Sequence, residues 1–219
     1  MAEGAGGFIE TERKYDAAAG FALPDLAGLA GVAAVTGPQT YRLRAIYFDT
    51  AGFSLAAAKI TLRRRTGGTD AGWHLKLPAG VDSRREVHAP LGRGASRVPP
   101  RLAGLVAGWT GGQPLRPIAR LATTRRARRL AGPGGEVLAE VADDLVIGSL
   151  PAPAPAGAAD PGMPEWQEVS RWREVEIELA TGPRELLDSA GDLLRRAGAA
   201  PSAAASKLSR LLESASTAP

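Results

Sequence analysis

The sequence predicts an α+β protein that is mainly β, with about eight strands, mostly antiparallel, and helices between some of them. Three observations lead to this prediction. Charged side chains recur at every second position in several segments, which is the period of an extended strand. Glycine-rich connectors join neighbouring segments in the manner of hairpin loops. A few other segments have the apolar spacing of a helix.

The first part of the chain contains five of these strands and one helix. Residues 8–15 predict the first strand from their alternating charges. Residues 24–35, rich in alanine and leucine, predict a short helix that the Gly-Pro pair at 37–38 ends. The other strands of this part are expected at residues 39–50, 59–66, 73–78 and 83–90, with a glycine-rich hairpin loop at 67–72.

The second part of the chain supplies the remaining strands and three helices. Residues 99–109 predict a helix with proline in its first turn, and residues 183–197 predict an amphipathic helix. The remaining expectations are strands at 117–130, 136–147 and 166–179, a hairpin loop at 131–135, a flexible surface loop at 151–164 and a last helix at 206–212. Because the strand after the 151–164 loop is needed to complete the set, the sequence predicts a single domain over residues 6–213.

Composition narrows the chemistry that is available. The 219 residues include no cysteine, which excludes disulfides, thiolate zinc sites and cysteine nucleophiles, and two histidines, which exclude a three-histidine metal site. Hard-cation binding through carboxylates is the metal chemistry that remains. No run approaches the ~20 apolar residues of a membrane span, and the first residues lack the pattern of a signal peptide, so we expect a cytoplasmic protein without a membrane partner.

The charged residues of the strands share single faces. Glu10, Glu12 and Lys14 lie two apart, as do Arg63 and Arg65. Arg84 and Glu86 are also two apart, and so are successive members of Glu174, Glu176 and Glu178. Asp144 follows Glu140 by four residues, which places both on one face of a strand. Like charges this close repel unless a ligand bridges them. An open, charged lumen with helices packed outside explains why such strands are polar on both faces.

A polyphosphate together with a divalent metal would bridge both sets of charges. Arginine and lysine neutralise phosphoryl oxygens, and carboxylates hold Mg²⁺ or Mn²⁺, which also bind phosphate. A nucleic-acid partner is not expected, because the basic run at 125–129 has no aromatic residues for base stacking.

Several blocks of the sequence together resemble the CYTH superfamily, also called triphosphate tunnel metalloenzymes. The opening block is Glu-x-Glu-x-Lys at residues 10–14. The others are Tyr-Phe-Asp-Thr at 47–50, Leu-Arg-Arg-Arg at 62–65, Lys-Leu-Pro at 76–78, Arg-Arg-Glu at 84–86, the acidic strands at 140–144 and 174–178, and Ser-Lys at 206–207. Their order is that of the family, and the resemblance runs from residue 8 to about residue 212.

The resemblance implies a closed tunnel of eight antiparallel strands and a set of site residues. By position, the catalytic residues would be Glu10, Glu12, Lys14 and Lys76. Phosphate groups would bind Lys14, Arg63, Arg65, Lys76, Arg84, Arg125 and Lys207, the last at one tunnel mouth. Metal would bind Glu10, Glu12, Asp144, Glu176 and Glu178, supported by Glu86, Glu140 and Glu174. The register of the basic run leaves Arg126 as an alternative to Arg125.

The resemblance further implies a metal-dependent hydrolase of a triphosphate-containing small molecule, with Mg²⁺ or Mn²⁺ as cofactor. Inorganic tripolyphosphate, cleaved to pyrophosphate and phosphate, is the expected substrate, because no base-reading motif is present. The alternatives are an adenylate cyclase of class IV type, a thiamine triphosphatase, or a non-catalytic binder of polyphosphate or organophosphates. We expect the protein to be a monomer or a homodimer.

Overall fold

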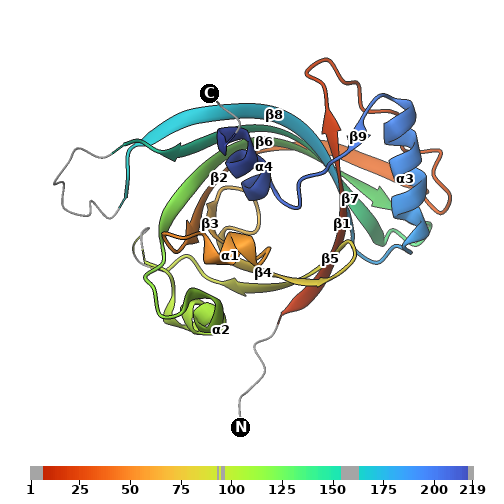
Figure 1. Cartoon of the computed structure of the whole chain (residues 1–219). Helices are drawn as coiled ribbons and strands as arrows, with labels where there is room; N and C mark the ends of the chain where they lie inside the picture. The colour runs from red at the N-terminus through yellow and green to blue at the C-terminus, as the bar shows by residue number, and fades with distance from the viewer. Residues whose placement is uncertain (1–6, 93, 95–96, 154–162, 217–219) are drawn as a thin grey trace, which may run out of the picture.

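The computed structural model describes residues 7–92, 94, 97–153 and 163–216, which form a β-barrel with helices packed against it; α2 and α3 lie outside the ring of strands, and α4 lies over its opening (Figure 1). The eight barrel strands are β1 (Phe8–Ala17), β2 (Ala34–Asp49), β3 (Thr61–Thr66), β4 (Gly72–Gly80), β5 (Ser83–Ala89), β6 (Arg116–Ala131), β7 (Val137–Pro151) and β8 (Trp166–Leu179). Neighbouring strands are antiparallel throughout. The predicted strands are therefore confirmed, most of them with small extensions at their ends.

The barrel closes because its first and fifth strands pair. The strand order is β5-β4-β3-β2-β6-β7-β8-β1, and β1 then pairs with β5 through Glu10 opposite Arg84. A ninth, two-residue strand, β9 (Ala200–Pro201), pairs with β1 outside this ring. Closure leaves the eight-stranded ring without a free edge and gives it an inner face on which alternate residues of each strand meet.

Most of the apolar core lies between the outer face of the barrel and three of the helices. The helices are α1 (Ser54–Ala57), α2 (Pro100–Thr110), α3 (Glu185–Arg196) and α4 (Lys207–Ser216). Two clusters of buried apolar residues lie on the outer face, where they pack α3 on β1, β7 and β8 and pack α1 and α2 on the side of β2 to β5. The third cluster packs α4 against inward-facing residues of β2, β6, β7 and β8, among them the tunnel-lining Ala45, Tyr47 and Leu121. Because two of the three clusters lie on the outer face, much of the inner face is left for polar side chains.

Helix α4 is seated by a close approach to β7. A Cβ atom at Gly148 would lie 2.5 Å from Leu211 Cδ1 and 3.1 Å from the Trp172 ring, so only glycine leaves room for these side chains. The apolar contact of Leu208 and Leu211 with the barrel fixes the start of α4 at Lys207, whose side chain enters the barrel.

One predicted element is wrong. Residues 24–35 form turns rather than a helix, and β2 already begins at Ala34, so the pair at 37–38 lies inside a strand. Leu26 and Leu29 are buried against the barrel, but Gly31 has a φ of +82°, which an α-helix does not allow. The apolar spacing therefore reports burial of a turn segment.

Two further observations concern the rest of the chain. The predicted loop at 151–164 falls mostly outside the described residues, since 154–162 are not described. Within the described part, no helix combines the length and the apolar character that a membrane crossing requires.

Candidate active site

The barrel encloses a cavity of about 500 Å³ whose lining is rich in charge. Its acidic side chains are Glu10, Glu12, Asp70, Glu86, Glu140, Asp144, Glu176 and Glu178. Its basic side chains are Lys14, Arg63, Arg65, Lys76, Arg84, Arg125, Arg129 and Lys207. We call this charged interior the tunnel. The two signs balance, so the tunnel charges must be understood as pairs and networks rather than as one field.

The two signs are concentrated on opposite walls. Strands β7, β8 and β1 are adjacent in the ring and carry six of the eight acids, whereas β6, β3, β4 and β5 carry six of the eight bases. The exceptions are Lys14 on β1, Glu86 on β5, Asp70 in the β3–β4 loop and Lys207 on α4. This arrangement suits a ligand that has cations on one side and anionic oxygens on the other.

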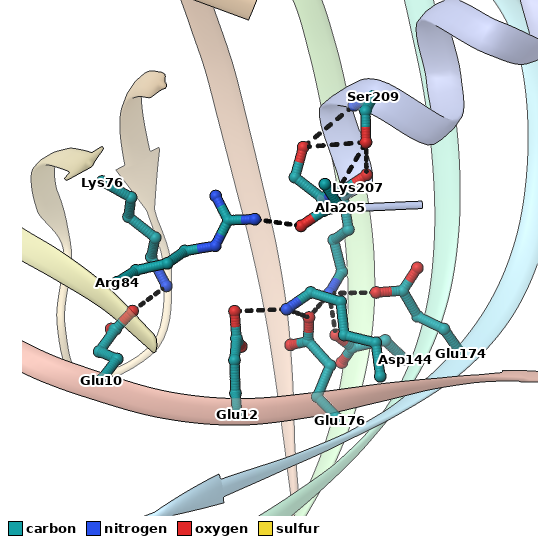
Figure 2. Close-up of polar contacts among 12 residues, drawn as sticks. Glu10, Glu12, Lys76, Arg84, Asp144, Glu174, Glu176, Ala205, Lys207 and Ser209 are labelled. Atoms are coloured by element: carbon teal, nitrogen blue, oxygen red, sulfur yellow. Dashed lines mark hydrogen bonds and ion pairs between the residues drawn. The ribbon is translucent and has the colours of Figure 1, made fainter. Parts of the chain in front are cut away.

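The ammonium of Lys207 sits among three carboxylates (Figure 2). Its Nζ lies 3.0 Å from Asp144 Oδ2, 2.7 Å from Glu174 Oε1 and 2.8 Å from Glu176 Oε1. Burial by itself would lower the pKa of Lys207, but these three acids raise it above its ordinary value. Lys207 therefore neutralises the acidic wall from α4, where the sequence predicted a phosphate contact.

Arg125 is the second cation of this network. Its guanidinium donates two hydrogen bonds to Asp144, at 2.9 and 2.7 Å, and one to Glu176 Oε2 at 2.7 Å. Burial would raise the pKa of Glu176, but Lys207, Lys14 and Arg125 hold it well below the usual range. Arg126 is exposed on the outer face, so the register places Arg125 inside, as predicted.

A second network links β1 to β4 and β5. Lys76 Nζ lies 2.5 Å from Glu10 Oε2 (Figure 2). It also lies 3.4 Å from Glu86 Oε2. Burial, together with a hydrogen bond shared with Glu86, raises the pKa of Glu10 to about 8 despite the nearby Lys76. Glu86 moves the opposite way: burial would raise its pKa, but His74, Glu10 and Lys76 lower it well below its usual range. Of these two buried acids, Glu10 therefore holds a proton more readily than Glu86.

Three carboxylates form a row across the acidic wall. In the strand register Glu12 lies opposite Glu178, and Glu178 lies opposite Glu140 on its other side. Directly opposed like charges destabilise a sheet unless something bridges them. Burial raises the pKa of Glu178, with Lys76 opposing and Glu12 adding to the rise. Lys14 pairs with Glu12, and Arg129 pairs with Glu140 at 3.7 Å, which leaves Glu178 without an ion pair among the described residues.

The basic wall has donors without acceptors. The Nε atoms of Arg63 and Arg65 are buried and find no hydrogen-bond acceptor among the described residues. Burial and the neighbouring Arg63 and Arg125 lower the pKa of Arg65 to about 9. Arg65 also pairs with Asp70, and Arg63 donates to Tyr47 Oη at 3.4 Å. An anion in the tunnel would meet these unsatisfied donors. Arg84 differs, because its guanidinium donates to the carbonyl of Ala205 and so ties β5 to the segment before α4.

Comparison with known proteins places the whole arrangement. The model of the CYTH domain family matches residues 9–212. The chain belongs to the CYTH family. Two uncharacterized proteins of Mycobacterium tuberculosis, from strains CDC 1551 / Oshkosh and ATCC 25618 / H37Rv, are each 46% identical over 209 residues. These matches cover 93% of this chain, which spans 40% of the length of each relative.

A solved structure agrees on the fold. The crystal structure of a putative adenylate cyclase from Bacillus halodurans is similar with a TM-score of 0.61 at 17% identity, covering 94% of this chain and 98% of that one. At this level of identity the likeness extends to the CYTH fold alone.

The structure brings nearly all predicted site residues of the CYTH domain together. Every one of them lines the tunnel except Glu174, which joins the site through Lys207. Asp49 of the Tyr-Phe-Asp-Thr block has a structural role, because its carboxylate accepts hydrogen bonds from the backbone N–H groups of Leu55 and Ala56 at the start of α1. His74 and His88 are not among the predicted site residues, yet both adjoin Glu86. Their spacing of two from Lys76 and Glu86 was the available signal.

We expect Lys207→Ala to destabilise the metal-free CYTH domain by about 3–5 kcal/mol, because three buried carboxylates lose their shared cation. Millimolar Mg²⁺ should recover part of this loss, since the vacated carboxylates then suit a hard cation. Chemical denaturation in chelator and in Mg²⁺ measures both effects. Arg195→Ala, which removes an exposed pair with Asp192, is the control and should cost at most ~1 kcal/mol. A Lys207→Ala variant as stable as the parent would contradict the network.

We expect Glu10 to make the metal-free protein less stable as the pH rises. Its folded-state pKa of about 8 lies above the ordinary 4.5, so the folded state binds more protons between these values. The unfolding free energy therefore falls across this window, by up to about 1.4 kcal/mol per pH unit. Glu10→Gln should gain stability over the parent at pH 8 and match it near pH 4.5. Denaturation at both pH values tests this, and a difference independent of pH would refute it.

Proposed function

We propose that this CYTH domain is a metal-dependent hydrolase of a triphosphate-containing small molecule, with inorganic tripolyphosphate as its substrate and pyrophosphate and phosphate as products. The observation that carries this proposal is the division of the tunnel into a basic wall and an acidic wall. The CYTH family binds triphosphate-containing small molecules, which supports the substrate class. The proposed setting is the cytoplasm.

The basic wall would hold the phosphoryl groups. Arg63, Arg65 and Lys76 lie on adjacent strands and face inward, and two of them have unsatisfied donors. Arginine binds phosphoryl oxygens through two N–H groups at once, and buried cations bind anions more strongly than exposed ones. Lys14 and Arg125 stand between the walls, so they would contact phosphate while staying paired with Glu12 and Asp144.

The acidic wall fits a hard divalent cation. The row of Glu12, Glu178 and Glu140 places like charges opposite one another, and oxygen ligands are those that Mg²⁺ and Mn²⁺ prefer. We propose that these residues, with Glu10 nearby, hold the metal. Bound there, a divalent ion would supply charge neutralisation for the phosphoryl oxygens and a more acidic water. Asp144 and Glu176, predicted as ligands, are engaged by Lys207 and Arg125, which gives them a positioning role in this proposal.

The tunnel offers little to recognise an organic group. The glycine-rich β3–β4 loop contributes Gly68, Thr69 and Asp70 to the lining, while the described ends of the 151–164 loop contribute nothing. Phe8 is half exposed at the lining, so stacking of a base or a thiamine ring on it is the feature that would favour the cyclase or the thiamine triphosphatase alternative. Binding energy from three phosphoryl groups does not by itself distinguish inorganic from organic triphosphates.

Removal of one carboxylate from the row should abolish hydrolysis while the fold is kept. We expect Glu12→Gln and Glu178→Gln each to lower kcat at least about 100-fold at saturating tripolyphosphate, with a Tm equal to or above that of the parent, because a like-charge contact is relieved. Phosphate release and thermal unfolding measure the two effects. Glu168→Gln, at an exposed pair with Arg171, is the matched control and should retain full activity. Full turnover by the parent in excess chelator would contradict the metal requirement.

The substrate is tested by comparing tripolyphosphate, ATP and thiamine triphosphate at fixed Mg²⁺ or Mn²⁺. We expect the highest kcat/KM for tripolyphosphate, because the few aromatic side chains of the lining offer little to offset the desolvation of an organic group. Release of phosphate and pyrophosphate, and formation of cyclic AMP, are the measurements. Preference for ATP with cyclic AMP as product would replace this proposal by the cyclase, and tight binding of all three without turnover would replace it by the non-catalytic binder.

A further inference from the structure

Both histidines of the chain meet one carboxylate on the inner face of β4 and β5. His74 lies directly opposite His88 in the strand register, and Glu86 precedes His88 by two residues on the same face. Three side chains with lone-pair donors therefore converge from two paired strands, at the edge of the site described above. We call His74, Glu86 and His88 the histidine cluster.

The three donor atoms of the histidine cluster are close together. His74 Nδ1 lies 2.6 Å and His88 Nε2 lies 2.9 Å from the same oxygen, Glu86 Oε1. One ligand atom from each residue falls within 4.8 Å of the others. His74 and Glu86 are 1% and 2% exposed, whereas the side chain of His88 is 42% exposed and lines the tunnel. Two members of the cluster are thus buried, and the third, His88, is open to the tunnel.

The hydrogen bonds of His74 turn a lone pair toward Glu86. Its Nε2 lies 3.0 Å from the backbone carbonyl of Asp70, which can only accept, so Nε2 carries a proton. In the neutral ring, the proton on Nε2 leaves the lone pair of Nδ1 facing Glu86 Oε1, 2.6 Å away. A metal ion between these two atoms would accept an electron pair from each.

We propose that the histidine cluster is a second metal site, distinct from the carboxylate row, which binds Zn²⁺ or a similar borderline divalent ion. Two imidazole nitrogens and one carboxylate oxygen form a donor set that Zn²⁺ uses with a fourth, open position. The contact from His74 Nε2 to a carbonyl is the outer-shell bond that fixes ligating histidines. Zn–ligand bonds of about 2.0–2.2 Å require donor atoms roughly 3.3 Å apart. The contacts of Glu86 with His74, at 2.6 Å, and with His88, at 2.9 Å, must therefore both widen on binding.

Glu86 would connect this site to the phosphate site. Its Oε1 belongs to the histidine cluster, while its Oε2 lies 3.4 Å from Lys76 Nζ. Phe8 packs edge-on against His88, with ring centroids 5.3 Å apart, and borders the open side. An ion held here would add positive charge to the basic wall beside Lys76.

Imidazole nitrogen NMR gives a direct test, because the chain has two histidines and both can be assigned. We expect one equivalent of Zn²⁺, added to chelator-stripped protein in Mg²⁺ buffer, to shift the nitrogens of both rings and to leave His74 protonated at Nε2. Mg²⁺ alone should shift neither ring. Unchanged histidine resonances at one equivalent of Zn²⁺ would overturn the proposal, whether or not the protein hydrolyses triphosphates.

Variants locate the ion by calorimetric Zn²⁺ titration. His88→Gln changes a partly exposed side chain, so the fold should persist, and it should weaken Zn²⁺ binding at least about tenfold. Glu174→Gln alters a separate cluster of three carboxylates, Asp144, Glu174 and Glu176. This variant should keep a Zn²⁺ affinity within about twofold of that of the parent protein. The reverse result, with Zn²⁺ lost from Glu174→Gln and kept by His88→Gln, would assign the ion to the acidic wall and refute the histidine cluster.

Discussion

The desolvation of charge inside a closed barrel is the constraint on which this structure depends. Sixteen acidic and basic side chains line one tunnel, eight of each sign, and each must find a partner there or meet a ligand. Most of the apolar stabilisation that offsets this cost comes from outside, where α1, α2 and α3 pack on the outer face of the strands, while α4 packs against inward-facing apolar residues. The interior of this barrel is therefore mainly charged, and most of its apolar core lies on the outer face.

Helix α4 links an apolar contact with the barrel to the charged network of the tunnel. Leu208 and Leu211 seat it against the barrel, and the preceding residue, Lys207, places its ammonium among three carboxylates. Breaking such a buried network is far more costly than the network is stabilising. The helix thus ties the integrity of the acidic wall to an apolar contact, and any change in α4 would be felt at the site.

The charges that remain poorly matched are those with the clearest functional meaning. The carboxylate row repels itself, and the buried Nε atoms of Arg63 and Arg65 lack acceptors among the described residues. Asp144, by contrast, is fully engaged by Arg125 and Lys207. Proteins keep poorly matched groups where function requires them, which separates residues that would bind ligand from residues that position them. Glu86 contacts Lys76 of the proposed phosphate site with one oxygen and both residues of the histidine pair, His74 and His88, with the other.

The sequence by itself determined the strands and the inner face, because the two-residue period of Glu10, Glu12 and Lys14 is local. It misplaced a helix at 24–35, since apolar spacing records burial and Gly31 adopts a backbone conformation that a helix excludes. Only the tertiary structure shows that Arg125, rather than Arg126, faces the tunnel. It also shows that Lys207 pairs with Asp144, and that His74 and His88 both contact Glu86. These pairings depend on strand register and on closure of β1 with β5, which bring together residues far apart in the chain.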